Sequence, residues 1–145
     1  MRILGLDVGT KTIGVAMSDE LLFTAQAFKV IRRTELSADL HRVSEIANSF
    51  QCSRIVVGMP RNMNGTYGPS ADAIRVFMSD LSGATDIPID IWDERMTTMV
   101  ANRALLEANV RRKKRREVVD KIAAAVILQG YLDARSRRIQ APDEE

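Results

Sequence analysis

The sequence predicts a single α/β domain over residues 1–145, built on a mixed five-stranded sheet with helices on both faces. The chain has 145 residues, 46% of them hydrophobic, which is enough for one core. Its apolar segments follow the order strand, strand, strand, helix, strand, helix, strand, helix, helix. Strands joined by tight turns favour antiparallel pairing, whereas strands separated by helices favour parallel pairing. We therefore expect antiparallel hairpins on one side of the sheet and parallel strands on the other.

The hairpins come first in the chain. Residues 2–8 form an apolar strand that leads into a tight turn at Gly9, and residues 12–18 resume at once as a second strand. Residues 23–31 give a third, weaker strand pattern.

Helices and buried strands alternate in the rest of the chain. The segment 54–58 is apolar after Arg54 and stops before Pro60, as expected of a strand buried on both faces. Ser70 is placed to cap a helix and Gly83 to end it. Helices are expected over 35–50, 70–83, about 97–108 and 117–135, a further strand over 88–92, and a polar tail over 136–145.

Composition excludes several classes of protein and site. No apolar run approaches 18 residues and no signal-peptide pattern is present, so we expect a cytoplasmic protein without a membrane span. Cys52 is the only cysteine, which excludes an internal disulfide and a multi-cysteine zinc site and favours a buried thiol. His41, the only histidine, lies among charged residues that include Asp39 on a predicted helix, and we interpret it as a solvated surface histidine.

The positive charge of the chain is local. Net charge is +2, but the run Arg111, Arg112, Lys113, Lys114, Arg115 and Arg116 alone carries +6, so the other residues are net −4. Such a run repels itself, and its simplest interpretation is a solvated segment. Its functional interpretation is a mobile arm that contacts phosphates and becomes ordered on binding nucleic acid.

Four carboxylates are candidates for chemistry. Asp7 ends the first strand among apolar neighbours, where it could bind a ligand or bond its own turn. Asp93 and Glu94 end a later strand, and alternation lets only one of them face the same layer as Trp92. Asp120 lies in the first turn of the last predicted helix, where the helix dipole also favours it.

Carboxylates from two strand ends and a helix suit a hard cation such as Mg²⁺ or Mn²⁺. One histidine and one cysteine cannot build an ordinary zinc site. The chemistry indicated is metal-assisted attack on a phosphoryl group. The glycine-containing segment 5–12 is not a Walker A loop, because it joins strand to strand and its lysine does not follow the second glycine.

These fragments together resemble the YqgF (RuvX-like) family of Holliday junction resolvases and pre-16S rRNA nucleases. The match runs from residue 2 to about residue 135, and four motifs in the right order make it specific. The matching fragments are GLDVG at 5–9 with GVA at 14–16, GMP at 58–60 with NG at 64–65, DERMTT at 93–98, and VDK at 119–121 with the segment 123–133.

The resemblance implies a ribonuclease H-like fold and a nuclease dependent on Mg²⁺ or Mn²⁺. It identifies Asp7, Glu94 and Asp120 as the catalytic, metal-binding triad, with Asp93 as a further ligand or a neighbour of the ligands. The residues expected to border the substrate are Lys11, Arg61, Asn64, Arg95, Thr97 and the basic run 111–116.

The expected substrate is structured nucleic acid, with the 5′ end of precursor 16S rRNA ahead of a four-way DNA junction. Two other functions remain open from the sequence. An ATP-binding domain shares the sheet topology and the Asp-x-Gly-Thr hairpin, but such proteins need two domains to close a cleft. A non-catalytic RNA-binding assembly factor would use the carboxylates structurally. We expect a monomer or a weak homodimer.

Overall fold

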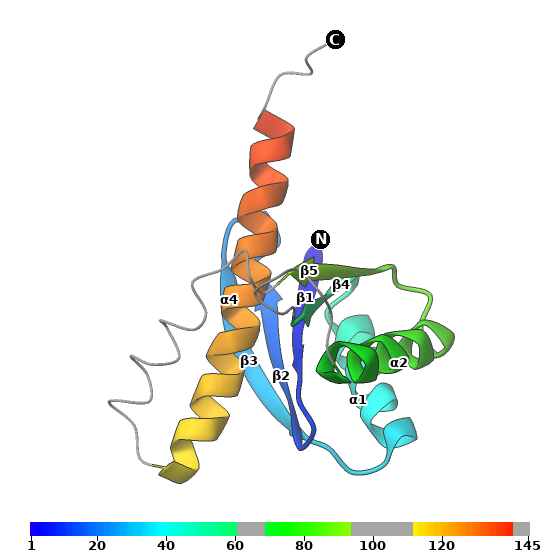
Figure 1. The fold of residues 1–145 in the computed structure, drawn as a ribbon. Coiled ribbons are helices and arrows are strands. Elements are labelled where there is room, and N and C mark those ends of the chain that lie inside the picture. Colours follow the sequence, from blue (N-terminus) through cyan, green and yellow to red (C-terminus); the bar gives the residue numbers. More distant parts are fainter. Residues whose placement is uncertain (61–68, 94–111, 141–145) are drawn as a thin grey trace.

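The computed structural model is a central sheet with helices on either side (Figure 1). It describes residues 1–60, 69–93 and 112–140, and the side chains within 1–60, 71–93 and 121–137. The elements are β1 (Arg2–Val8), β2 (Thr12–Ser18), β3 (Ala25–Arg32), α1 (Leu36–Ser49), β4 (Cys52–Met59), α2 (Pro69–Ala84), β5 (Ile89–Asp93) and α4 (Arg112–Gln140). The predicted helix over 97–108 and the loop at 61–68 lie outside the described residues.

The sheet has five strands in the order β3-β2-β1-β4-β5. The hairpins pair antiparallel, with Leu6 opposite Val15 and Ile13 opposite Ile31. The helix-separated strands pair parallel, with Leu6 beside Val57 and Val57 beside Ile91. The predicted mixed sheet is therefore confirmed, with its antiparallel and parallel halves meeting at β1.

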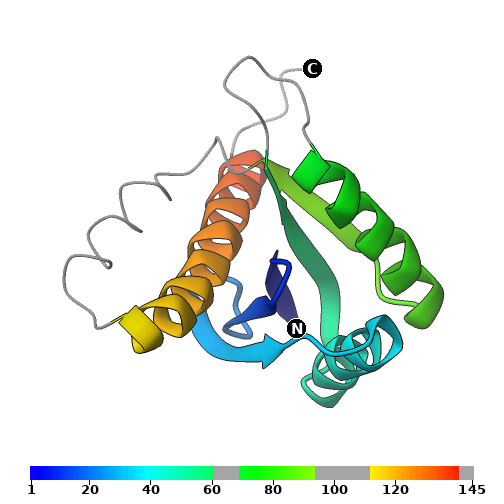
Figure 2. The same ribbon diagram turned by 60° about the horizontal axis from the view of Figure 1, so that its bottom comes forward.

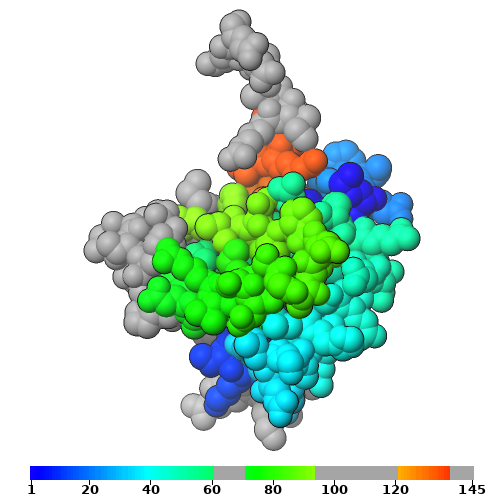
Figure 3. Space-filling view, turned by 90° about the vertical axis from the view of Figure 1, so that its right-hand side faces the viewer, coloured from blue at the N-terminus to red at the C-terminus, as the bar shows by residue number. Residues whose placement is uncertain are grey.

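Helices α1 and α2 cover one face of the sheet, and α4 crosses the other (Figure 2). Seen from the α2 side, the two shorter helices lie together over the strands (Figure 3). Alternate strand residues such as Leu4, Leu6 and Val57 form the larger core under α1 and α2. Their neighbours Ile3 and Val56 point the other way, into the core under α4.

Helix α4 approaches β1 closely at Gly5. A Cβ at this position would lie 2.8 Å from the Cβ of Leu128 and 3.3 Å from the carbonyl oxygen of Ala124. The absence of a side chain at Gly5 therefore sets how near α4 comes to the sheet, and it places α4 against β1 at residues 124–128.

Several boundaries differ from those expected. Strand β3 begins at Ala25 rather than 23, because residues 19–24 form a hairpin loop with its own hydrogen bonds. Strand β4 begins at Cys52 and ends at Met59, so it is longer at both ends than the expected segment 54–58. Ser70 is not the N-cap expected of α2, because the helix begins at Pro69, and proline is favoured in the first helical turn. Gly83 does not end α2, which continues to Ala84.

The last helix was expected to begin at residue 117, after the basic run, and the structure instead includes residues 112–116 as the first turns of α4. That these residues contact phosphates and become ordered on binding nucleic acid stays a prediction. Arginine and lysine are among the better helix formers, and each like-charge pair on a helix costs only a few tenths of a kcal/mol. Helix propensity therefore outweighs the repulsion. At its other end α4 extends through Gln140, into the expected polar tail.

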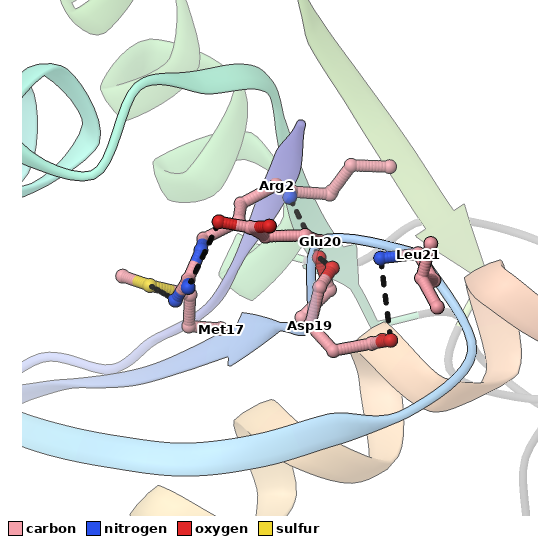
Figure 4. A network of polar contacts seen from close by, with 7 residues as sticks. Arg2, Met17, Asp19, Glu20 and Leu21 are labelled. Atoms are coloured by element: carbon pink, nitrogen blue, oxygen red, sulfur yellow. Dashed lines mark hydrogen bonds and ion pairs between the residues drawn. The ribbon is translucent and has the colours of Figure 1, made fainter.

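The β2–β3 loop is held by one carboxylate (Figure 4). The Asp19 side chain accepts backbone N–H bonds from Leu21 at 3.3 Å, Phe23 at 2.8 Å and Thr24 at 2.9 Å. The Thr24 bond contributes most to keeping the pKa of Asp19 below its usual value. From α4, the Gln129 side chain bonds Ala25 N–H at 2.8 Å. No helix in the described part of the chain is long and apolar enough to cross a membrane.

Candidate active site

The carboxyl ends of β1, β4 and β5 lie at one edge of the sheet, because these three strands run parallel. Asp7 is the penultimate residue of β1, and Asp93 is the last residue of β5. Open sheets with parallel strands bind ligands at this edge. The structure thus places both strand-end candidates at the expected location, on either side of β4.

Asp7 faces α4. Side chains alternate along a strand, so Asp7 shares a face with Ile3 and Gly5, which lie against α4, while Val8 packs into the core on the other face. The Asp7 side chain is half-buried. A carboxylate in this position remains accessible to a ligand while the strand fixes its direction.

The backbone of α4 passes the same end of the sheet. In Figure 1, α4 runs opposite to β1, with its first turns on the side of the β1–β2 turn. Ala124 lies against Gly5, and Asp120 is one helical turn earlier in α4. Asp7 lies two residues beyond Gly5 along β1, toward the same end of the sheet as Asp120. The side chain of Asp120 lies outside the described set, so its convergence with Asp7 stays a prediction.

The direction of Trp92 shows which of Asp93 and Glu94 can face the same side of the sheet as Asp7. The indole of Trp92 packs against the α4 core, so Asp93, the next residue in β5, points to the opposite face. Glu94 lies outside the described residues. Asp93 is therefore on the wrong face of the sheet to join Asp7 from within β5.

The β1–β2 turn after Asp7 is clamped by an arginine from the end of β3. The turn closes with a bond from Gly9 N–H to the Thr12 carbonyl at 2.8 Å. Arg33 Nη1 donates to the Gly9 carbonyl at 2.9 Å, and Arg33 N–H donates to the Lys11 carbonyl, also at 2.9 Å. Lys11 itself is exposed at the turn, which suits its predicted contact with substrate.

Asp39 holds this arginine in place. Its carboxylate accepts from Arg33 Nε at 3.2 Å and from Thr34 N–H at 3.0 Å, and its side chain is only 1% exposed. The Arg33 guanidinium also lies over the ring of Phe77, 5.3 Å from its centroid. His41, two residues later on the same helix, is exposed as expected. Sequence periodicity could not reveal Asp39, because its burial depends on a partner from another element.

A second polar cluster lies farther along the α4 face. The Tyr131 hydroxyl donates to Asp90 Oδ2 at 2.7 Å, and Arg54 pairs with the same carboxylate and donates to the Tyr131 hydroxyl. Burial, and then the bond to Asp90, raises the pKa of Tyr131. Trp92 meets Tyr131 edge to face at 6.4 Å. No local sequence pattern indicates this cluster, which joins residues about forty positions apart.

The remaining predicted site residues are not tested. Glu94, Arg61, Asn64, Arg95, Thr97 and Arg111 lie outside the described residues, and 112–116 are placed in α4 without described side chains. Within the described part, no group of three or more histidine, cysteine or acidic side chains could hold a metal ion. Two of the three predicted ligands, Glu94 and Asp120, have side chains outside the described part. The Cys52 thiol is buried, as expected, and burial raises its pKa.

Comparison of the sequence with known proteins places it among close relatives. A model of the family described as "RuvX: Holliday junction resolvase" matches residues 1–134. A relative from Symbiobacterium thermophilum, named "Putative pre-16S rRNA nuclease", is 64% identical over 138 residues, covering 95% of this chain and 96% of the relative. A Bacillus subtilis relative of the same name is 50% identical, covering 92% and 99%.

Solved structures confirm the fold. The Thermus thermophilus RuvC protein in complex with a Holliday junction matches with a TM-score of 0.58 at 14% identity, covering 94% of this chain and 96% of that chain. The fowlpox virus Holliday junction resolvase matches with a TM-score of 0.54 at 12% identity, covering 92% and 99%. The ribonuclease H-like fold implied by the sequence motifs is therefore confirmed.

Proposed function

Because the chain belongs to the RuvX (YqgF) family, we propose that it is a divalent-metal-dependent nuclease that processes the 5′ end of precursor 16S rRNA. The observation that carries this proposal is the position of Asp7: a half-buried carboxylate at the carboxyl edge of the parallel strands, facing α4 near the level of Asp120. The proposed substrate also implies action in the cytoplasm.

The donor set fits a hard cation. Asp7 offers carboxylate oxygens, and in the proposed site Glu94 and Asp120 complete an oxygen-only set that suits Mg²⁺ or Mn²⁺. When bound, such an ion lowers the pKa of water and stabilises the leaving oxygen of a phosphodiester.

The chain's own residues position the reacting groups. Arg33 fixes the turn that follows Asp7 through the carbonyls of Gly9 and Lys11, so the backbone positions of Asp7 and of the exposed Lys11 keep a constant separation. Lys11 can then bind a substrate phosphate beside the cleaved bond. Arg61, Asn64, Arg95, Thr97 and the basic run 111–116 are proposed to bind the surrounding backbone.

A four-way DNA junction is the second candidate substrate, because the matching family model is described as a Holliday junction resolvase. Both substrates present phosphodiesters to the same carboxylates, so the chemistry does not separate them. A third possibility, a non-catalytic assembly factor, predicts binding without cleavage.

A side-by-side cleavage assay tests the proposal. Purified protein is incubated with a precursor rRNA 5′ extension or a synthetic four-way junction, in Mg²⁺, Mn²⁺, Zn²⁺ or chelator. We expect cleavage of the RNA with Mg²⁺ or Mn²⁺, none with chelator, and none in an Asp7→Asn variant. Preferential cleavage of the junction would favour the second candidate. Binding without cleavage in any metal would overturn the nuclease.

A further inference from the structure

A cleft of about 410 Å³ lies between the edge strand β5 and the C-terminal half of α4. Its walls include the rings of Trp92 and Tyr131 and the charged groups of Arg54, Asp90 and Arg135. None of these five residues belongs to the proposed metal-binding triad. The cleft is lined by both aromatic and cationic groups, a combination typical of surfaces that bind unpaired nucleotides.

The cleft begins in the same row of the sheet as Asp7. Leu6 pairs with Val57, so the parallel register places Asp7 beside Gly58, and Gly58 pairs with Trp92. Two strand spacings, about 10 Å, thus separate Asp7 from Trp92. All three residues face α4, and the middle one has no side chain to block the row. A chain bound at Asp7 can therefore reach Trp92 across the surface of β4.

The aromatic walls are fixed in place. The rings of Trp92 and Tyr131 stand almost perpendicular, with an interplanar angle of 87°. Asp90 and Arg54 hold the Tyr131 hydroxyl from the sheet side, which prevents the ring from turning away. The two rings form a preorganised corner, so a base that stacks there does not have to order them first.

Two side chains of the cleft, Arg135 and Trp92, have a donor group without a protein partner in the described part of the chain, and they indicate what the cleft could bind. Arg135 makes no ion pair within the described part of the chain, whereas Arg54 is paired with Asp90. The indole N–H of Trp92 is buried and lacks an acceptor there. Phosphate and base-carbonyl oxygens are suitable partners for an arginine and an indole donor, respectively.

We propose that the β5–α4 cleft binds one unpaired nucleotide of the substrate a few nucleotides from the cleaved bond, with its base against Trp92 and Tyr131 and its phosphate at Arg135. The proposal rests on the nuclease function above and specifies a substrate feature, namely a single-stranded segment near the cleavage site. Stacking does not distinguish ribose from deoxyribose, so the cleft binds unpaired RNA and DNA alike.

The binding test exploits the fact that Trp92 is the only tryptophan in the chain. Its fluorescence is titrated, in chelator to prevent cleavage, with a five-nucleotide oligoadenylate, its DNA counterpart, a blunt RNA duplex or inorganic phosphate. We expect saturable quenching by both single strands, and less than about a tenth of that quenching by duplex or phosphate. Equal quenching by duplex or phosphate, or no quenching by either single strand, would overturn the proposal.

Variants locate the nucleotide within the cleft. Arg135→Gln should weaken binding of a labelled oligoadenylate about five-fold, whereas Arg137→Gln, an equal charge change at an exposed site on the same helix, should stay within two-fold. Trp92→Leu should weaken it about ten-fold and Trp92→Phe much less. Equal effects of the two arginine variants would refute the placement. If circular dichroism shows that Trp92→Leu does not fold, the proposal is judged by the Arg135→Gln and Arg137→Gln variants and by the quenching of the wild-type protein.

The result is separable from the nuclease proposal. Metal-dependent cleavage without quenching would support the nuclease proposal and refute nucleotide binding in the cleft. Quenching by single strands without cleavage in any metal would leave a nucleotide-binding cleft on a protein that is not a nuclease.

Discussion

The two hairpin loops that flank β2, one at each end of the sheet, are held by different means. At the β2–β3 end, Asp19 bonds three backbone N–H groups of its own loop while remaining in solvent. At the β1–β2 end, Arg33 reaches in from the end of β3 and is itself anchored by buried Asp39 on α1. The first loop is held mainly by its own aspartate, with added bonds from Gln129 of α4, and the second depends on three elements.

The difference shows which end of the sheet must be placed accurately. The β2–β3 loop is closed by its own aspartate and bonded to Gln129 of α4, and none of these contacts is a buried ion pair. The β1–β2 turn cannot shift without breaking its bonds to Arg33, which buried Asp39 anchors, so the position of Asp7, two residues before Gly9, is tied to the packing of α1. Such anchoring suits a site where small displacements alter function.

The largest expected effect is on catalysis. Asp7→Asn should lower the cleavage rate by more than about 100-fold, because even changes beside metal ligands cost 10–100-fold. Stability to urea should change little, since the side chain is only half-buried. Asp19→Asn, the same chemical change at the other end of the sheet, should leave cleavage intact. Equal loss in both variants would contradict the assignment of chemistry to one end.

The next effect is on stability. Arg33→Gln should reduce the free energy of unfolding by about 3 kcal/mol, the lower end for a broken buried pair because Arg33 is partly exposed. Denaturant unfolding measures the loss. Arg42→Gln is the control, because Arg42 also bonds a backbone carbonyl, that of Arg32, but at an exposed position. If the two variants are equally stable, the clamp does not anchor the turn.

Gly5→Ala tests the close packing of α4 against β1. It should lower the free energy of unfolding by about 1–3 kcal/mol, because the added Cβ would lie 2.8 Å from the Cβ of Leu128. Thermal unfolding gives the value. Gly83→Ala adds the same group in α2, where nothing lies within 4 Å, and should stabilise the protein by up to about 1 kcal/mol. A stabilising Gly5→Ala would show that α4 can move away without penalty.

The smallest effect concerns acid stability. The Asp19 carboxylate has a lowered pKa in the folded protein, so its contribution is fully present above the unfolded value of 3.8 and is lost as pH falls through the folded value. The stability difference between wild type and Asp19→Asn should therefore shrink below pH 3.8. Glu20→Gln removes the same charge without the three backbone bonds. A pH-independent difference for Asp19→Asn would rule out the carboxylate as the cause.

Local patterns predicted the strands, the order of elements and the direction of Asp7, because these depend on alternation and turn residues. They failed where the outcome depended on a distant partner. Asp39 looks like any helix-surface acid until Arg33 is placed beside it, and Asp90 has no local sign of its bond to Tyr131. The start of α4 was misjudged because charge repulsion was weighed above helix propensity.

The uninterrupted course of α4 restricts insertions and deletions between its basic first turns and the Tyr131 corner. Each residue turns an α-helix by about 100°, so inserting one residue between Arg116 and Ala124 would rotate the basic turns away from their present side. An insertion of seven residues would restore the phase to within about 20°, although it would move the basic turns about 10 Å along the axis. Length variants in this segment would therefore be tolerated in steps of two helical turns rather than residue by residue.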